Sequence, residues 1–186
     1  MSKAINKTQR TLLLVVGLML LPVIAATALY FSGWQPTGKP NGELLQPAVA
    51  LHGDLSTPEG AALPLAKLEG RWHLVVAGAG ACNDNCLALL DNARRIHVAL
   101  YKQMPQVDRL WLSNAANAVE ASALRSQQPD LIAAVASNEA RIGFDLDRPG
   151  HRLYLMDPAG RVVMRYAPDT QPKAVLKDLE RLLRFS

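Results

Sequence analysis

The stretch of sequence that decides the fold is residues 72–86, which read WHLVVAGAGACNDNC. Its first six residues, 72–77, form a near-continuous apolar run, which is typical of a strand buried on both faces of a sheet. The Gly-Ala-Gly sequence at 78–80 then indicates a tight loop. Two cysteines, Cys82 and Cys86, come directly after it. The stretch therefore predicts a central strand whose carboxyl end leads into a cysteine pair.

A helix is predicted to follow over residues 83–104. Apolar side chains recur there at spacings of three and four, so they share one face of the helix. Asp91 and Arg95 form an i,i+4 pair in the favourable order, and Pro105 ends the helix. The apolar face consists of Cys86, Leu89, Ala93, Ile96 and Leu100. The cysteine pair thus lies at the junction of the central strand and its helix.

The neighbouring segments predict a mixed α/β arrangement. Residues 107–112 are expected to form the next strand, and the alanine-rich stretch 114–137 is expected to contain a helix interrupted near Pro129. Before the central strand in the sequence, residues 48–65 have short apolar stretches broken by Gly and Pro, which indicates an irregular hairpin.

The C-terminal part predicts two short strands and a last helix. Residues 152–156 and 162–166 are apolar and are joined by the sequence Asp-Pro-Ala-Gly, a good turn composition. Residues 173–183 are amphipathic and close the domain as a helix. A parallel βαβ unit followed by an antiparallel pair predicts an α/β sandwich.

The N-terminal segment is predicted to span a membrane. Residues 11–31 carry no charge over 21 residues, about the length that a helix needs to cross roughly 30 Å of hydrocarbon. Three basic residues precede it, so the positive-inside rule places the N-terminus in the cytoplasm and the rest of the chain across the membrane. A cleavable signal peptide is the alternative, because residues 26–28 are as small as signal peptidase requires. Both interpretations export the folded part.

The chain is therefore divided into four parts: a cytoplasmic tail (1–10), a transmembrane anchor (11–31), a linker (32–47) and one folded domain (48–186). The linker contains three glycines and three prolines and has no apolar period. We expect a single-pass protein of the inner (cell) membrane whose C-terminal domain lies in the periplasm.

The net charge of +4 has a topological origin. The tail contributes three basic residues and no acidic one, which leaves 17 basic against 16 acidic residues from position 32 onward. A nearly neutral domain gives no support to nucleic-acid binding. The sequence also contains no glycine-rich phosphate loop, no H-E-x-x-H and no G-x-S-x-G motif.

The cysteine pair is the candidate functional site. If Cys82 begins the helix, a spacing of four places both residues on one face, with Cα atoms about 6 Å apart, inside the range of a disulfide. A helix N-terminus also stabilises thiolates. Such a pair can cycle between dithiol and disulfide or hold a soft ion such as Cu(I). A purely structural disulfide is the alternative, although so short a loop constrains the unfolded chain little.

The sequence resembles the Sco/SenC family in the run LEGRW at 68–72, the C-x-x-x-C at 82–86 and the sequence YLMDPAG at 154–160. Members of this family are membrane-anchored thioredoxin-fold proteins that assist copper insertion into cytochrome c oxidase. The resemblance implies a thioredoxin-like sandwich with an N-terminal transmembrane helix, Cu(I) as the metal, and Cys82 and Cys86 as its ligands. It implies cytochrome c oxidase subunits or other assembly factors as partners.

The third ligand of the family is a histidine five residues before the tyrosine of the Y-L-x-D-P turn. In this chain that position is Pro149, and the nearest histidine is His151, two residues later. Thioredoxin-like oxidoreductases have a cis-proline facing the cysteines six residues before the aspartate of the analogous turn, and His151 has that position relative to Asp157. This position lets His151 face the cysteines. A shift of two residues along an extended strand moves its side chain by about 6.6 Å from the family position, so His151 is the candidate third metal ligand only if the backbone accommodates that shift.

The other histidines are interpreted as structural. His97 lies on the helix face of Cys86, but eleven residues of helix separate the two by about 16 Å. His73 begins the central strand, and His52 lies in the predicted hairpin. Few histidines outside a cluster of ligands act as switches or metal ligands.

These observations lead to one hypothesis and two alternatives. The hypothesis is a membrane-tethered, exported factor of respiratory oxidase biogenesis that handles Cu(I), the thiol–disulfide state, or both. Cys82 would be the attacking thiol or first copper ligand, and Cys86 the resolving thiol or second ligand. The first alternative is an enzyme, a general thiol–disulfide oxidoreductase without metal, which the proline at position 149 favours. The second is a redox-inactive membrane assembly scaffold.

Overall fold

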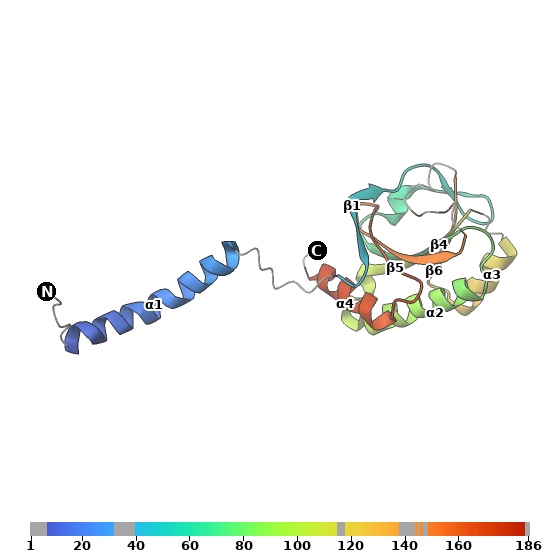
Figure 1. Ribbon diagram of the computed structural model, residues 1–186. Coiled ribbons are helices and arrows are strands. Elements are labelled where there is room, and N and C mark those ends of the chain that lie inside the picture. The colour runs from blue at the N-terminus through green and yellow to red at the C-terminus, as the bar shows by residue number, and fades with distance from the viewer. Residues whose placement is uncertain are drawn as a thin grey trace. The chain divides into compact units, whose positions relative to one another are not determined.

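Strand β4 (Trp72–Gly78) lies inside an eight-stranded sheet with the order β1-β8-β7-β4-β5-β6-β2-β3. The computed structural model describes residues 7–31, 40–114, 118–137, 144, 146 and 149–184 (Figure 1). Strand β4 pairs in parallel with β5 and antiparallel with β7, and every one of its residues is buried. The other strands are β1 (Glu43–Ala50), β2 (Leu55–Ser56), β3 (Ala62–Leu63), β5 (Val107–Ser113), β6 (Leu131–Ala136), β7 (His151–Met156) and β8 (Arg161–Arg165).

Successive side chains of β4 point alternately to the two faces of the sheet, and each face has its own apolar core. Leu74 and Val76 pack with the inner faces of three helices, α2 (Asp84–Ala99), α3 (Ala118–Gln127) and α4 (Pro172–Leu183), which lie on one side of the sheet in Figure 1. Val75 and Ala77 face the opposite core. That core includes Leu51, Leu55, Leu68, Leu110, Leu112, Phe144, Leu146, Tyr154 and Met156. The α/β sandwich predicted from the sequence is confirmed.

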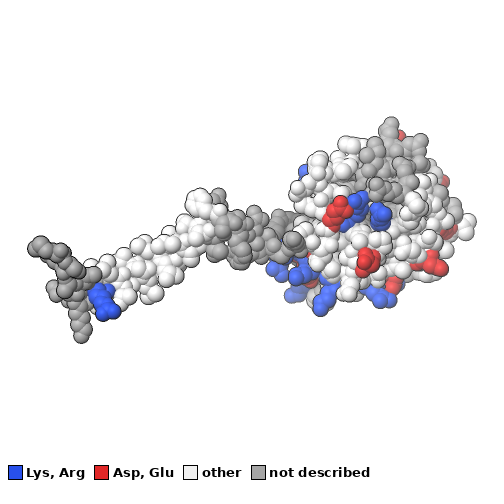
Figure 2. All heavy atoms as spheres, in the orientation of Figure 1, with Lys and Arg blue, Asp and Glu red and all other residues white. Residues whose placement is uncertain are grey.

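The N-terminal part of the chain forms a separate unit, residues 1–39, whose helix α1 runs from Lys7 to Phe31. Within it, residues 9–28 have a mean hydropathy of 2.4, and α1 is by length and composition able to cross a membrane. Pro22 lies inside the helix without ending it. Figure 2 shows Lys, Arg, Asp and Glu interspersed over one face of the second unit, whereas the middle of α1 carries none of them.

The second unit begins at residue 40, eight residues before the domain start that the sequence suggested. Residues 40–47, assigned to the linker, enter the fold because α4 holds them. The backbone N–H groups of Asn41 and Gly42 donate to the buried Asp178 carboxylate at 2.8 and 3.1 Å. Strand β1 then pairs with β8. Proline and glycine content suggested a linker, but a buried acceptor 136 residues away orders this segment.

The helix predicted over residues 83–104 is shorter than expected. Helix α2 ends at Ala99 and is followed by a 3-10 segment, η2 (Tyr101–Gln106), which contains Pro105. Tyr101 has a φ of 49°, in the left-handed region that interrupts a right-handed helix. Helix α2 therefore ends at Ala99, before the end at residue 104 that Pro105 alone predicts.

One strand was not predicted. The alanine-rich stretch 114–137 contains α3, as expected, but residues 131–136 form β6, which pairs in parallel with β5. The turn between α3 and β6 is fixed by the buried guanidinium of Arg109 on β5. This group donates to both carboxylate oxygens of Asp130, at 2.6 and 3.1 Å. The predicted hairpin over 48–65 is present only as the β2–β3 pair, because β1 joins the far edge of the sheet.

A disulfide and a buried histidine at the candidate functional site

The cysteine pair forms a disulfide at the carboxyl end of β4, with the two Cα atoms 5.1 Å apart. Cys82 lies in the loop before α2 and is half-buried, whereas Cys86 lies in the first turn of α2 and is completely buried. Asn83 caps the helix, since its side-chain oxygen accepts the backbone N–H of Cys86 at 3.1 Å. The local sequence thus places both sulfurs where strand and helix meet, as expected.

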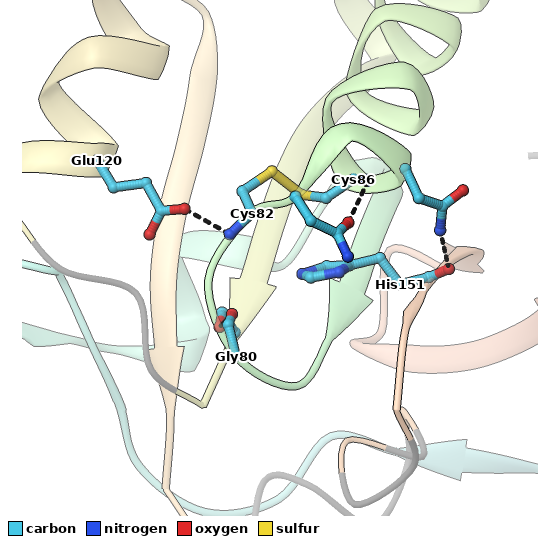
Figure 3. Close-up of a disulfide and its surroundings, with 8 residues drawn as sticks. Gly80, Cys82, Cys86, Glu120 and His151 are labelled. Carbon is cyan, nitrogen blue, oxygen red and sulfur yellow. Dashed lines mark hydrogen bonds between the residues drawn. A yellow bond between two sulfur atoms is a disulfide. The ribbon is translucent and has the colours of Figure 1, made fainter.

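Neighbouring elements hold the loop that carries Cys82. The N–H of Gly80 donates to the Asn114 side chain at 2.8 Å, and the Ser113 hydroxyl donates to the Gly80 carbonyl at 2.7 Å. Gly80 has a φ of 82°, which favours glycine at this position. The backbone N–H of Cys82 donates to a carboxylate oxygen of Glu120 from α3 (Figure 3). The loop is therefore anchored from β5 and from α3.

His151 is the first residue of β7 and reaches the same edge of the sheet. Its Cα pairs with that of Gly78, the last residue of β4, and its ring lies so close that a Cβ on Gly78 would be 2.6 Å from two ring carbons. The residue is only 1% exposed. In Figure 3 the imidazole extends from β7 toward the disulfide that joins Cys82 in the loop to Cys86 in α2. Glycine at position 78 is what makes room for this ring.

Neither ring nitrogen of His151 hydrogen-bonds to any residue that the structure describes. Burial lowers the pKa of this imidazole, and the negative charge of Glu120 opposes that effect. The ring is therefore neutral at neutral pH and keeps one nitrogen lone pair available. A buried polar side chain without partners is costly, so such a residue calls for an explanation.

These residues suit a soft metal ion only when the disulfide is reduced. In the oxidised pair both sulfurs are bonded to each other, and among the described residues no three His, Cys, Asp or Glu side chains are arranged to hold a metal. Reduction would create two thiols beside a neutral imidazole that has no hydrogen-bond partner among the described residues. Thiolate and imidazole are ligands that Cu(I) accepts, so the donor set fits this ion.

Sequence comparison places the chain in a family. The family described as "Transmembrane-like, thioredoxin-like, C-terminal domain" matches residues 72–186, which include β4, the disulfide and His151. The chain belongs to this family. No curated protein sequence matches it. The match begins at Trp72, the first residue of β4, and the folded unit that contains it, residues 40–186, is called the thioredoxin-like domain below.

Solved structures with the same fold include several Sco proteins. Apo Sco1 of Thermus thermophilus is 20% identical, with a TM-score of 0.63 over 80% of this chain and 99% of that chain. Copper-bound ScoI of Bradyrhizobium japonicum is 23% identical, with a TM-score of 0.53 over 71% and 99%. BsSco, described with a disulfide switch, is 13% identical, with a TM-score of 0.57 over 82% and 100%. The resemblance to Sco proteins and the thioredoxin-like fold are thereby confirmed.

The remaining histidines of this thioredoxin-like domain lie away from the disulfide. His73 is at the opposite end of β4, where its Nδ1 is 3.1 Å from the Arg71 carbonyl. His97 is near the end of α2, where its two nitrogens lie 3.2 Å from the Met104 carbonyl and 3.4 Å from Asp130. His52 is exposed. The structure therefore brings His151, and none of these three, to the cysteine pair.

Three residues at the site were not identified from the sequence: Gly78, Asn114 and Glu120. The signal for Glu120 was present but weak, since it is the only charged residue between Asn114 and Leu124. Gly78 was interpreted only as part of a loop. Each acts through a partner distant in sequence, which local patterns do not reveal.

Proposed function

We propose that this protein is a membrane-tethered, exported thioredoxin-like factor of respiratory oxidase biogenesis, which carries Cu(I) through Cys82, Cys86 and His151. The observation that carries the proposal is the buried imidazole of His151, which has no hydrogen-bond partner among the described residues and extends toward a cysteine pair. A histidine used only by the fold would have a hydrogen-bond partner.

The Sco structures support the copper and assembly parts of this proposal. ScoI of Bradyrhizobium japonicum is described with copper bound, and BsSco as a member of a family of cytochrome c oxidase assembly proteins. Both share the fold of this chain at low identity. The transfer of these roles therefore depends on the residues that this chain itself presents, namely two cysteines and one histidine at the same edge of the sheet.

Each residue has a distinct role in the proposed mechanism. An external dithiol reduces the disulfide by exchange, which gives two thiols on this chain and leaves the external dithiol oxidised to a disulfide. Cys82, which is half-buried in the loop, is the thiol that incoming Cu(I) meets first. Cys86 is buried at the N-terminus of α2, where the helix dipole favours its thiolate. Cu(I), the cargo, replaces the thiol protons, and neutral His151 offers a nitrogen lone pair without losing a proton.

The decisive experiment is a competition titration of the reduced full-length protein, in detergent, with Cu(I) held by a chromophoric chelator. Wild type is expected to withdraw one equivalent of Cu(I), and the Cys82→Ser/Cys86→Ser double variant is expected to withdraw none. The matched control is Ser56→Ala/Ser122→Ala, two changes of similar size outside the site. No withdrawal by wild type, or equal withdrawal by the double serine variant, would remove copper from the proposal.

A general thiol–disulfide oxidoreductase is the second candidate, and the disulfide itself favours it. Equilibration with dithiothreitol at defined ratios of oxidised to reduced reagent would give the reduction potential of the pair. An exchanging enzyme is expected to have a potential within the roughly −120 to −270 mV spanned by known thiol–disulfide oxidoreductases. A pair that stays oxidised below about −300 mV would instead be a structural disulfide.

The membrane part of the proposal rests on α1. We infer that α1 anchors the protein in the inner membrane, with the N-terminus in the cytoplasm and the thioredoxin-like domain in the periplasm, because the basic residues precede the apolar segment. The mass of the mature protein tests the anchor. Loss of the first 28 or so residues would identify a cleaved signal peptide instead.

A further inference from the structure

The two cysteines are held in place by different contacts. Cys86 is fixed by α2, because it is completely buried and its N–H donates to the helix cap Asn83. Cys82 lies outside the helix, and its backbone N–H donates to the Glu120 carboxylate of α3. Reduction breaks the covalent link that ties Cys82 to α2. The hydrogen bond to Glu120 involves neither sulfur, so breaking the S–S bond does not by itself remove it.

Glu120 has the features of a rigid support for this loop. It lies in the first turn of α3, where a carboxylate is stabilised by the helix dipole. Ala121 and Leu124, which follow it on the same helix, are packed in the apolar core. The neighbouring Gly80 amide is held by a neutral acceptor, Asn114, whereas Cys82 is held by a charged one.

The same carboxylate lies close enough to His151 for its charge to act on that imidazole. In Figure 3, Glu120 approaches the disulfide loop from α3, while His151 approaches it from β7. The two elements are brought together only by the tertiary fold. One carboxylate is thus positioned against the cysteine that reduction releases and near the histidine that must converge with it.

We propose that Glu120 is a positioning residue of the copper site: by fixing the Cys82 amide, it keeps the Cys82 side chain directed toward Cys86 and His151 in the reduced protein. This inference rests on the proposed function, and it assigns to Glu120 no contact with the metal. It predicts that the hydrogen bond to the Cys82 amide, and not the charge of the side chain, is what the site requires.

Three variants of the reduced full-length protein separate the bond from the charge. Glu120→Gln removes the charge but keeps an oxygen that can accept the amide hydrogen. Glu120→Asp keeps the charge but shortens the side chain by one methylene, and Glu120→Ala removes both. In competition against a Cu(I) chelator, Glu120→Ala and Glu120→Asp are expected to weaken Cu(I) binding about tenfold, the order expected when a part-buried amide loses its hydrogen bond. The Cu(I) affinity of Glu120→Gln is expected to stay within about twofold of that of wild type.

Ser122→Ala, an exposed neighbour on α3, is the matched control and should bind Cu(I) as wild type does. The thermal midpoint of each oxidised variant is measured in parallel, because a merely structural loss would lower it in proportion to the loss of affinity. If Glu120→Ala does not fold, the comparison of Glu120→Gln with Glu120→Asp still separates the hydrogen bond from the charge. Wild-type affinity in the Asp variant, or a tenfold loss in the Gln variant, would overturn the assignment of a positioning hydrogen bond.

The double serine variant, titrated beside these three, distinguishes the two possible failures. Wild-type binding after loss of both cysteines would contradict the proposed function itself. Loss of binding in that variant, together with wild-type affinity in Glu120→Ala and Glu120→Asp, would leave the copper function standing and remove only the role of Glu120.

Discussion

A fully buried histidine lies at each end of strand β4, His73 on β4 itself and His151 on the adjacent β7, and the surroundings of the two imidazoles differ. At the amino end, His73 has Nδ1 3.1 Å from the Arg71 carbonyl and Nε2 4.0 Å from an Asp108 carboxylate oxygen. At the carboxyl end, the ring of His151 lies against Gly78 and makes no hydrogen bond with the described residues. Burial lowers the pKa of both, so neither is distinguished by its protonation state.

The difference lies in what each ring is free to do. The nitrogen of His73 that bonds to Arg71 is already committed to the fold, and a carboxylate of the adjacent strand lies near the other. His151 has two nitrogens that the described part of the fold does not use, beside a cysteine pair. Hydrogen bonding, more than burial or pKa, therefore separates a structural histidine from a candidate ligand. The following predictions test that distinction.

The largest expected effect is on Cu(I) affinity when the two histidines are exchanged for glutamine. His151→Gln is expected to weaken binding by the reduced protein about a hundredfold or more. Changes to residues that only hold a metal ligand in place already cost 10- to 100-fold, and this change removes a proposed ligand. His73→Gln is expected to leave the affinity unchanged. Competition titration against a Cu(I) chelator measures both, and equal affinities for the two variants would abolish the distinction.

The next effect concerns the space that the imidazole occupies. Gly78→Ala would place a Cβ 2.6 Å from both the His151 ring and the Gly150 carbonyl oxygen, and Gly42→Ala would place one 2.6 Å from the Tyr166 ring, away from the site. Each change should lower the free energy of unfolding by roughly 1–3 kcal/mol, the usual cost of overpacking. Only Gly78→Ala should also weaken Cu(I) binding, by about tenfold, since it displaces His151.

Those two glycine variants form a matched pair for chemical denaturation and Cu(I) titration. If Gly42→Ala weakened copper binding as much as Gly78→Ala did, the loss would follow from general destabilisation. The close approach of His151 to Gly78 would then have no bearing on the site.

A smaller effect is expected on the pH dependence of stability. Burial holds the pKa of His73 in the folded state below its ordinary value of 6.5. As the pH falls below about 6.5, the unfolded chain therefore binds a proton that the folded chain does not, and stability decreases. One such imidazole changes the free energy of unfolding by at most about 1.4 kcal/mol per pH unit in this pH range. Urea unfolding at pH 5.5 and 7.5 should show a smaller difference for His73→Gln than for wild type.

The smallest effect is expected for His97, the second histidine whose ring has identified partners. It is half-buried at the surface, so His97→Ala should cost no more than about 1 kcal/mol of unfolding free energy, the worth of one ordinary hydrogen bond. Cu(I) affinity should not change. A loss of affinity in this variant would show that the titration reports overall stability.

The sequence predicted the elements whose patterns are local. The apolar run before the cysteines predicted β4, the three- and four-residue spacing predicted α2, and together they placed Cys82 and Cys86 at one junction. Strand β6 was missed because LIAAVA, at the end of an alanine-rich stretch, fits a helix as well as a strand. Its state was decided by pairing with β5 and by the Arg109–Asp130 ion pair.

The site was predicted in the same partial way. Counting along the turn sequence singled out His151, but its burial and its approach to Gly78 follow only from the pairing of β7 with β4, as does a ring without hydrogen bonds to the described residues. Glu120 reaches Cys82 across 38 residues of sequence. The sequence by itself determined which residues can carry thiol and imidazole chemistry, because residue type and local spacing are sufficient for that. The tertiary structure decided which of them meet, because strand pairing and helix packing bring together residues far apart in the chain.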